Sequence, residues 1–339
     1  MANLGNTCFL NSCIQILNQI DEVERIRVAP PIQTDKQDDA AVLTQWFILR
    51  EAMLHPPADI PEPVVINPLN FVRTIHQIAG KKGRDLFTGW AQNDLPEFLL
   101  FILECAHNAR SRSIKTRVNG TSSNKTDDLA IQCYKMLQST YEREYSEFYD
   151  LFYGVYVSRL LTPDGATVHS NKPESYCTLD LPIPASAAAH RPLHLFDCFD
   201  AFVADELLSG WMNERTNAKE PVVKNIVFWN FPKILIIVLK RYSPDGRLKN
   251  GELVQYPLDD LDLSKYVVGY KASSYKYRLF GVANHMGGVS GGHYTAFTRG
   301  PKQTDAWYLC NDSSVQPANE REVVSSAAYV LTYRKIENE

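Results

Sequence analysis

The residue types best suited to chemistry lie near the two ends of the 339-residue chain. Cys8 follows a polar turn for which Gly5 and Asn6 are suited, and Thr7 is a suitable helix N-cap. Apolar residues then recur at helical spacing, at Phe9, Leu10, Cys13, Ile14, Leu17 and Ile20. Cys8 is therefore predicted in the first turn of a helix, where free amides and the helix dipole stabilise a thiolate. A lone cysteine is otherwise a small buried apolar residue, which is our interpretation of Cys13.

A candidate base lies far downstream of this cysteine. The run Gly291-Gly292-His293-Tyr294 precedes an alternating strand, and Asn311-Asp312 follows a few residues later. A thiol nucleophile needs a base, and the base needs a third group that holds its tautomer. Cysteine, histidine and then Asn or Asp is the chain order of papain-like proteases. His285 is a rival base, to which we assign a structural or loop contact.

These runs resemble the motifs of a known family, the ubiquitin-specific proteases, which are cysteine deubiquitinases of the papain-like class. Asn-Leu-Gly-Asn-Thr-Cys at 3–8 resembles their cysteine box. Gly-Gly-His-Tyr at 291–294, with Trp-x-x-x-Asn-Asp-Ser-Ser-Val at 307–315, resembles their histidine box. The resemblance implies that Cys8 attacks the carbonyl of the terminal glycine of ubiquitin, giving a thioester that water hydrolyses. It implies that His293 is the base and that Asn311 orients it, with Asp312 as an alternative or secondary orienter.

The family's oxyanion hole has a matching residue at Asn3. The resemblance implies that the Asn3 side-chain amide donates to the oxyanion, where a preorganised donor contributes roughly 3–4 kcal/mol. Turn formation is the alternative role for Asn3, as it is for Asn311 at the end of a strand.

Asp94 and Glu97 admit two interpretations. Asp-x-x-Glu before an apolar run is a capping box, and Pro96 fits the first turn of such a helix. The run Gln92–Leu99 also resembles the family segment Gln-Gln-Asp-Ala-x-Glu-Phe-Leu, in which the acidic pair receives arginines of the ubiquitin tail. The run departs from that segment at Asn93, Leu95 and Pro96. We predict both roles for the pair.

A glycine-rich stretch separates His285 from His293, with glycines at 287, 288, 291 and 292. It is predicted to be a mobile loop, and the corresponding loop in the family lies over the tail of the substrate. The resemblance implies that Gly291, Gly292 and Tyr294 contact the substrate in a tunnel that admits only Gly-Gly at the scissile end.

The patterning between the motifs predicts an α+β fold. Helices are expected after Cys8, over 41–54, from Phe71 to Gly80, after Gln92, and over 129–149 and 193–208. Strands are expected at 148–161, 231–242, 277–284, 293–299, 306–310 and 328–335, and an exposed loop at 110–128. The resemblance implies a single papain-like catalytic domain over 1–339, with a helical thumb (about 1–147), β fingers (about 148–230) and a β palm (about 231–339).

Composition narrows the function classes. The 35 basic and 39 acidic residues nearly balance, which argues against a nucleic-acid binder, and no apolar run reaches membrane-spanning length. The 7 cysteines never form a Cys-x-x-Cys pair and no signal peptide is present, so we expect a monomeric intracellular domain, cytoplasmic or nuclear. The abrupt start at the cysteine box suggests a catalytic domain cut from a longer protein.

We expect no cofactor and no metal. Many family members hold a structural zinc at the fingertips through two Cys-x-x-Cys pairs, but this chain has 162–165 (Thr-Pro-Asp-Gly) and 211–214 (Trp-Met-Asn-Glu) there. The nearby residues that still offer ligand atoms are His169, Cys177, His190, His194 and Cys198.

Two other function classes stay open. One is a catalytically silent ubiquitin-binding scaffold, against which the intact Cys8, His293 and Asn311 argue. The other is a protease for a different ubiquitin-like modifier. The expected partners are ubiquitin and ubiquitinated proteins.

Overall fold

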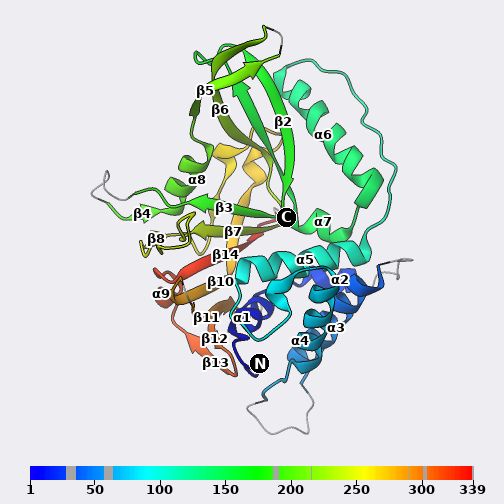
Figure 1. Ribbon diagram of the computed structural model, residues 1–339, viewed down its shortest axis with the longest axis vertical. Helices are drawn as coiled ribbons and strands as arrows, with labels where there is room; N and C mark the ends of the chain where they lie inside the picture. The colour runs from blue at the N-terminus through cyan, green and yellow to red at the C-terminus, as the bar shows by residue number, and fades with distance from the viewer. Residues whose placement is uncertain are drawn as a thin grey trace.

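The computed structural model describes residues 1–27, 36–56, 64–185, 191–214, 216–289, 291–300 and 304–337. Three parts are distinct in Figure 1: helices at the lower right, a sheet at the lower left and a long sheet at the top. We name them the thumb, the palm and the fingers.

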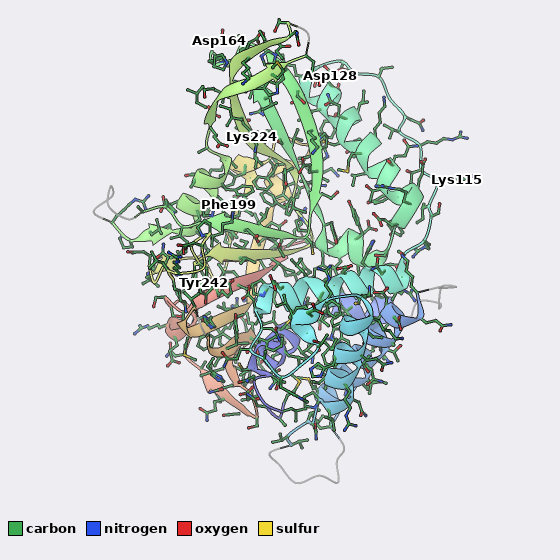
Figure 2. All side chains as sticks on the ribbon, in the orientation of Figure 1. Lys115, Asp128, Asp164, Phe199, Lys224 and Tyr242 are labelled. Atoms are coloured by element: carbon green, nitrogen blue, oxygen red, sulfur yellow. The ribbon has the colours of Figure 1, made fainter. Side chains whose placement is uncertain are left out.

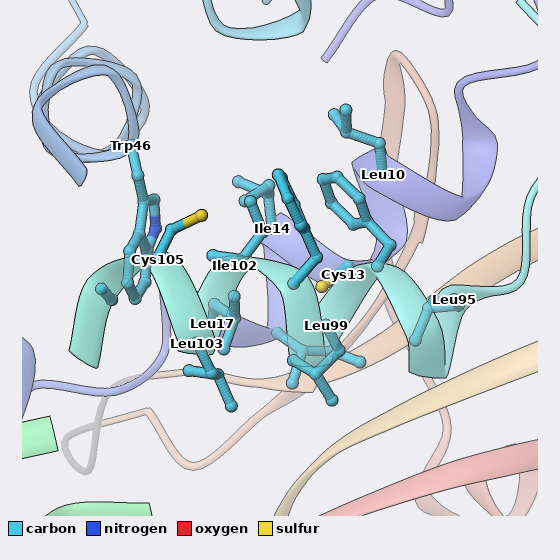
Figure 3. Close-up of a cluster of buried hydrophobic side chains, with 14 of the residues drawn as sticks. Leu10, Cys13, Ile14, Leu17, Trp46, Leu95, Leu99, Ile102, Leu103 and Cys105 are labelled. Carbon is cyan, nitrogen blue, oxygen red and sulfur yellow. The ribbon is translucent and has the colours of Figure 1, made fainter. Parts of the chain in front are cut away.

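The thumb consists of helices packed around α1 and α5. Its elements are α1 (Cys8–Leu17), α2 (Glu22–Arg27), α3 (Gln37–Leu54), α4 (Leu69–Lys81), η1 (Asp85–Phe87), α5 (Leu95–Arg110) and α7 (Glu147–Phe152). Helix α6 (Lys125–Glu144), which the predicted thumb range includes, lies instead beside the fingers (Figure 1). Figure 3 shows Leu10, Ile14 and Leu17 of α1 beside Leu99 and Ile102 of α5, and all five are buried. Burying one such side chain contributes about 1.5–3 kcal/mol, so this core fixes the helix that carries Cys8.

The fingers are an antiparallel sheet with strand order β2-β1-β6-β5 among the described residues. The strands are β1 (Gly154–Leu161), β2 (Val168–Tyr176), β5 (Glu206–Asn213) and β6 (Ala218–Asn230). Asp164, in the turn between β1 and β2, marks the tip in Figure 2. Helix α6 covers one face, where Cys133 and Ala130 pack against Val155, Val157 and Trp229.

The palm is a mixed sheet with order β13-β12-β11-β10-β14-β7-β3, to which β9 adds by pairing with β10. Its strands are β3 (Thr178–Pro182), β7 (Ile234–Lys240), β9 (Leu261–Asp262), β10 (Lys276–Gly288), β11 (Gly291–Arg299), β12 (Trp307–Asn311), β13 (Ser314–Ala318) and β14 (Ala328–Lys335). Only the β3–β7 pair is parallel in this sheet as described. Smaller elements complete the palm: β4 (Leu193–His194), α8 (Leu195–Val203), β8 (Val254–Gln255), η3 (Ser264–Tyr266), η4 (Ala272–Ser274) and α9 (Glu320–Val323).

Several predicted element bounds differ from the structure, and three of the corrections have a clear physical reason. The strand expected from residue 148 begins at Gly154, because Phe148, Leu151 and Phe152 have helical spacing and bury into the thumb core as α7. The helix expected to residue 208 ends at Val203: its apolar stripe stops at Phe202, and Leu207 lies 68 % exposed in β5.

The third correction concerns the glycine-rich loop between His285 and His293. It is mostly a β-hairpin, in which Met286 pairs with His293, Gly287 with Gly292 and Gly288 with Gly291. The strands β10 and β11 therefore continue up to Gly288 and Gly291, where a mobile loop was predicted.

None of the described helices has the length and hydropathy needed to cross a membrane.

Candidate active site

Cys8 is the first residue of α1, and that helix packs against β11, β10 and β12 of the palm. The predicted helix start is confirmed, and Cys13 lies in the core as predicted, 1 % exposed. Thr7 occupies the N-cap position, but its side chain caps no helix amide. Its hydroxyl instead accepts a hydrogen bond from the Leu4 amide (3.0 Å) and donates to Oδ1 of Asn3 (3.2 Å). The capping role predicted for Thr7 is therefore replaced by a role in folding the cysteine box.

The Cys8 thiol is buried, and burial raises its pKa above the ordinary value. The main-chain N–H groups of Tyr294, Phe9 and Cys8 favour the thiolate and oppose this shift, whereas the charge of the Asp312 carboxylate adds to it. The predicted stabilisation at the helix start is thus present but is outweighed by desolvation. Cys8 rests as a thiol and needs a base to become a nucleophile.

His293 lies on β11 beside Asn311, the last residue of β12. Its Nε2 is 2.7 Å from Oδ1 of Asn311. Since an amide oxygen only accepts, Nε2 carries the proton and Nδ1 is free to accept one. The hydrogen bonds of the described residues include none between the Cys8 sulfur and His293. In substrate-free proteases such contacts are often long and shorten when substrate binds.

Asp312 contacts the cysteine box and not the imidazole. Its Oδ2 accepts from Nδ2 of Asn3 (2.8 Å) and its Oδ1 from Nδ2 of Asn11 (2.7 Å). It lies in the two-residue turn between β12 and β13, with φ of 49°, where the left-handed region favours Asn, Asp and Gly. We predicted that Asp312 helps to orient His293. In the structure its carboxylate instead contacts Asn3 and Asn11.

Asn3 is held from both ends of its side chain. Its Oδ1 accepts from the main-chain amides of Gly5 (3.0 Å) and Thr7 (3.2 Å), while Nδ2 donates to Asp312. The second N–H of Nδ2 has no partner among the described residues. Its role as an oxyanion donor stays a prediction, and the rigid setting of the amide favours it.

Asp94 occupies the N-cap position of α5, but its carboxylate caps no amide, so the capping-box interpretation is wrong. The carboxylate accepts from the hydroxyls of Tyr294 (2.8 Å) and Tyr329 (3.1 Å), two palm residues. Burial raises the Asp94 pKa, and these two hydrogen bonds oppose the increase. Glu97 lies exposed in the first turn of α5.

Gln92 is a site residue that our sequence analysis did not single out. Its Oε1 accepts from the main-chain amide of Gly292 (2.9 Å), and its Nε2 donates to the Gly292 carbonyl (3.0 Å). The signal available in the sequence was its place at the head of the run Gln92–Leu99.

Close packing explains both glycines before His293. A Cβ on Gly291 would lie 2.6 Å from Oε1 of Gln92, and one on Gly292 would lie 2.5 Å from Nε2 of His285. The two glycines are therefore needed by the site itself, and the substrate contacts expected of them stay a prediction.

His285 is buried behind the site. Its Nδ1 lies 2.5 Å from the Tyr242 hydroxyl and 3.0 Å from Nζ of Lys249, and its ring packs on Tyr294 with centroids 4.6 Å apart. Burial, followed by the Lys249 charge, lowers its pKa to about 4. His285 is accordingly a neutral structural residue in this fold.

No group of three potential metal ligands occurs among the described residues. At the fingertips His169 and Trp211 pack ring on ring at 5.0 Å. Of the other candidate ligands, Cys177 and Cys198 are buried free thiols, and His190 lies outside the described residues. The predicted lack of zinc stays a prediction.

A cysteine at a helix N-terminus facing a His–Asn pair on a sheet defines the papain-like class of cysteine proteases. A family model described as ubiquitin carboxyl-terminal hydrolase matches residues 1–333. Ubiquitin carboxyl-terminal hydrolase 2 of Bos taurus is 31 % identical over 353 residues, with 98 % of this chain and 54 % of the relative covered. Ubiquitin carboxyl-terminal hydrolase 21 of Mus musculus is 33 % identical over 358 residues, covering 98 % of this chain and 61 % of the relative. This chain belongs to the ubiquitin carboxyl-terminal hydrolase family.

The predicted family is thereby confirmed, and solved structures confirm the α+β fold. A SAGA DUB module of Ubp8, Sgf11, Sus1 and Sgf73 bound to monoubiquitin matches with a TM-score of 0.71 at 19 % identity, covering 100 % of this chain and 69 % of that chain. The module with ubiquitin aldehyde matches with a TM-score of 0.69 at 20 % identity, covering 100 % and 70 %. This chain spans between half and two thirds of the length of these two curated relatives.

Proposed function

We propose that this chain is a deubiquitinase, a thiol hydrolase of the isopeptide or peptide bond after the C-terminal glycine of ubiquitin. The observation that carries the proposal is that α1, which begins at Cys8, packs on β11 and β12, the two strands that carry the hydrogen-bonded pair His293 and Asn311. Two solved structures with this fold hold monoubiquitin and ubiquitin aldehyde, which supports ubiquitin as the partner.

The chemistry follows from the tautomer of His293. Its free Nδ1 takes the proton of the Cys8 thiol, and the thiolate attacks the carbonyl carbon of the terminal glycine. The oxygen that becomes negative is stabilised by the N-terminus of α1 and by the free N–H of Asn3. His293 then gives its proton to the leaving amine as the C–N bond breaks. Water hydrolyses the resulting thioester, with His293 again as the base.

The acidic pair gives the substrate's basic tail a place to bind. Glu97 is exposed at the start of α5, and Asp94 lies next to it against Tyr294, the residue after the base. We assign both carboxylates to arginines of the tail of ubiquitin.

All the described cysteines are free, which agrees with an intracellular, reducing location for a monomeric domain.

Ubiquitin carrying a C-terminal electrophile tests the proposal. The wild-type protein is expected to form a covalent adduct, Cys8→Ala none, and the matched control Cys13→Ala a normal one because Cys13 lies in the core. Cys8→Ala should also retain less than about 1 % of isopeptide cleavage while still binding ubiquitin. Binding without an adduct in the wild type would indicate a silent scaffold. An adduct only with a probe built on another modifier would reassign the substrate.

A further inference from the structure

We propose that Gln92 is a positioning residue for the reaction: its carboxamide pairs with the main chain of Gly292 across the thumb–palm junction and so holds His293 at a set distance from Cys8. The role rests on the proposed function, because it concerns the same site. It begins from the two reciprocal hydrogen bonds between this side chain and Gly292.

The edge of β11 explains why a side-chain amide fits there. In the described part of the chain, β12 pairs with residues 296–299 of β11, and no strand lies beside the preceding residues of β11 on that edge. A carboxamide has the donor and acceptor of a peptide group, and Gln92 therefore binds Gly292 as a neighbouring strand would. Amides two residues apart point to the same edge. The main-chain N–H of Tyr294 lies on this edge and favours the Cys8 thiolate.

The thumb end of this connection is tied to the cysteine box. Nδ2 of Asn6, two residues before Cys8, donates to the carbonyl of Trp90 (2.9 Å) in the segment that carries Gln92. On the palm end, Gly292 directly precedes His293, whose ring is held by Asn311. A change at Gln92 thus acts on the distance between nucleophile and base without removing either.

The contact between Gln92 and β11 is close enough to favour glycine at position 291. Gly291 has φ of 152°, and any Cβ there would meet Oε1 of Gln92 at 2.6 Å. A second polar contact joins the palm to the cysteine box, because Asp312 accepts hydrogen bonds from Asn3 and Asn11. Gln92 and Asp312 thus connect the thumb and the palm at two points.

The first measurement is steady-state cleavage of a fluorogenic ubiquitin C-terminal amide by wild type, Gln92→Ala and Gln92→Glu. A displacement of catalytic groups on the order of 1 Å can cost about a hundredfold, so Gln92→Ala should lower kcat by about tenfold to a hundredfold with KM little changed. Gln92→Glu keeps the acceptor for the Gly292 amide and loses the donor, and its kcat should be intermediate. The matched control is Gln138→Ala. It removes a glutamine of α6 that donates to the Thr116 carbonyl, and this variant should behave as wild type.

The second measurement needs no ubiquitin. The rate at which iodoacetamide alkylates Cys8, followed by mass spectrometry as a function of pH, should shift to higher pH in Gln92→Ala, because His293 then stabilises the thiolate less well. This readout tests Gln92 even if ubiquitin is not the substrate, which separates the two proposals. Since Gln92 is exposed, the melting temperature of the variants should match that of the wild type.

A lowered KM or raised kcat/KM in Gln92→Ala would overturn the proposal, because it would show a side chain occupying the substrate's place. A raised KM with unchanged kcat would also overturn it and make Gln92 a substrate contact. An unchanged kcat and alkylation profile would make the two hydrogen bonds incidental.

Discussion

At the scale of single residues, the site separates two histidines that the sequence presents eight positions apart. His293 donates from Nε2 to the Asn311 amide and has no hydrogen bond at Nδ1 among the described residues, whereas Nδ1 of His285 contacts two half-buried side chains, Tyr242 and Lys249. This difference in environment supports His293 as the base. The contacts that set His285 apart come from Tyr242 and Lys249, which lie far from either histidine in the sequence.

His285 should therefore make stability depend on pH. Its pKa is about 4 in the folded protein and about 6.5 when unfolded, so the unfolded state binds more protons between these values. The free energy of unfolding should be fully maintained above about pH 6.5 and should fall as the pH is lowered towards about 4. Denaturant titrations across this window should show a weaker pH dependence in His285→Gln. An equal dependence in both proteins would contradict the neutral, buried state assigned to His285.

Glu97 provides a residue-scale test of substrate recognition. Its side chain is exposed, and the neighbouring Asp94 makes no cap, so neither is required to begin α5. Glu97→Gln removes only the charge and should leave the melting temperature unchanged. A charge-assisted hydrogen bond contributes roughly 1.5–3 kcal/mol, so KM for ubiquitin substrates should rise about ten- to a hundredfold. An unchanged KM would leave this segment with no part in binding.

At the scale of elements, sequence patterns predicted the helices and strands whose positions depend on the spacing of nearby residues. The helix that begins at Cys8, the start of α5 around Pro96 and the buried strand over 234–240 all follow from apolar periodicity and proline placement. The prediction from local spacing was wrong for Asp94. Its sequence has the capping pattern, but its hydrogen-bond partners, Tyr294 and Tyr329, lie on the palm. The same reason hid Gln92, which bonds a residue 200 positions away.

The fingers are the element for which the sequence predicts a difference from zinc-binding relatives. Their described strands are held by the α6 packing of Cys133 and Ala130 and by the His169–Trp211 ring contact at the tip. Elemental analysis of the purified protein should find far less than one zinc per chain, and a chelator should leave the melting temperature unchanged. A stoichiometric zinc whose removal lowers the melting temperature would show that ligands elsewhere in the chain bind it.

At the scale of the whole molecule, the thumb and one face of the palm share a core, which contains α1 and α5 with palm residues such as Phe280 and Tyr294. A second core lies on the other face of the palm sheet. At the surface of the thumb–palm junction, polar contacts of Gln92 and Asp312 join the thumb and the cysteine box to the ends of β11 and β12. Such contacts, unlike the cores, are open to single substitutions that leave the fold intact.

Asp312→Ala separates the electrostatic and the positional parts of this arrangement. The Asp312 carboxylate raises the pKa of the Cys8 thiol, so its removal should lower that pKa and move alkylation of Cys8 to lower pH. The same change frees Asn3 and Asn11, and a lost oxyanion donor costs about a hundredfold to a thousandfold in kcat. We therefore expect a more reactive thiol in a slower enzyme. A faster cleavage of ubiquitin together with faster alkylation would contradict this expectation. The hydrogen bond from Asn3 to Asp312 would then have no catalytic value, and Asp312 would affect the nucleophile through its charge alone.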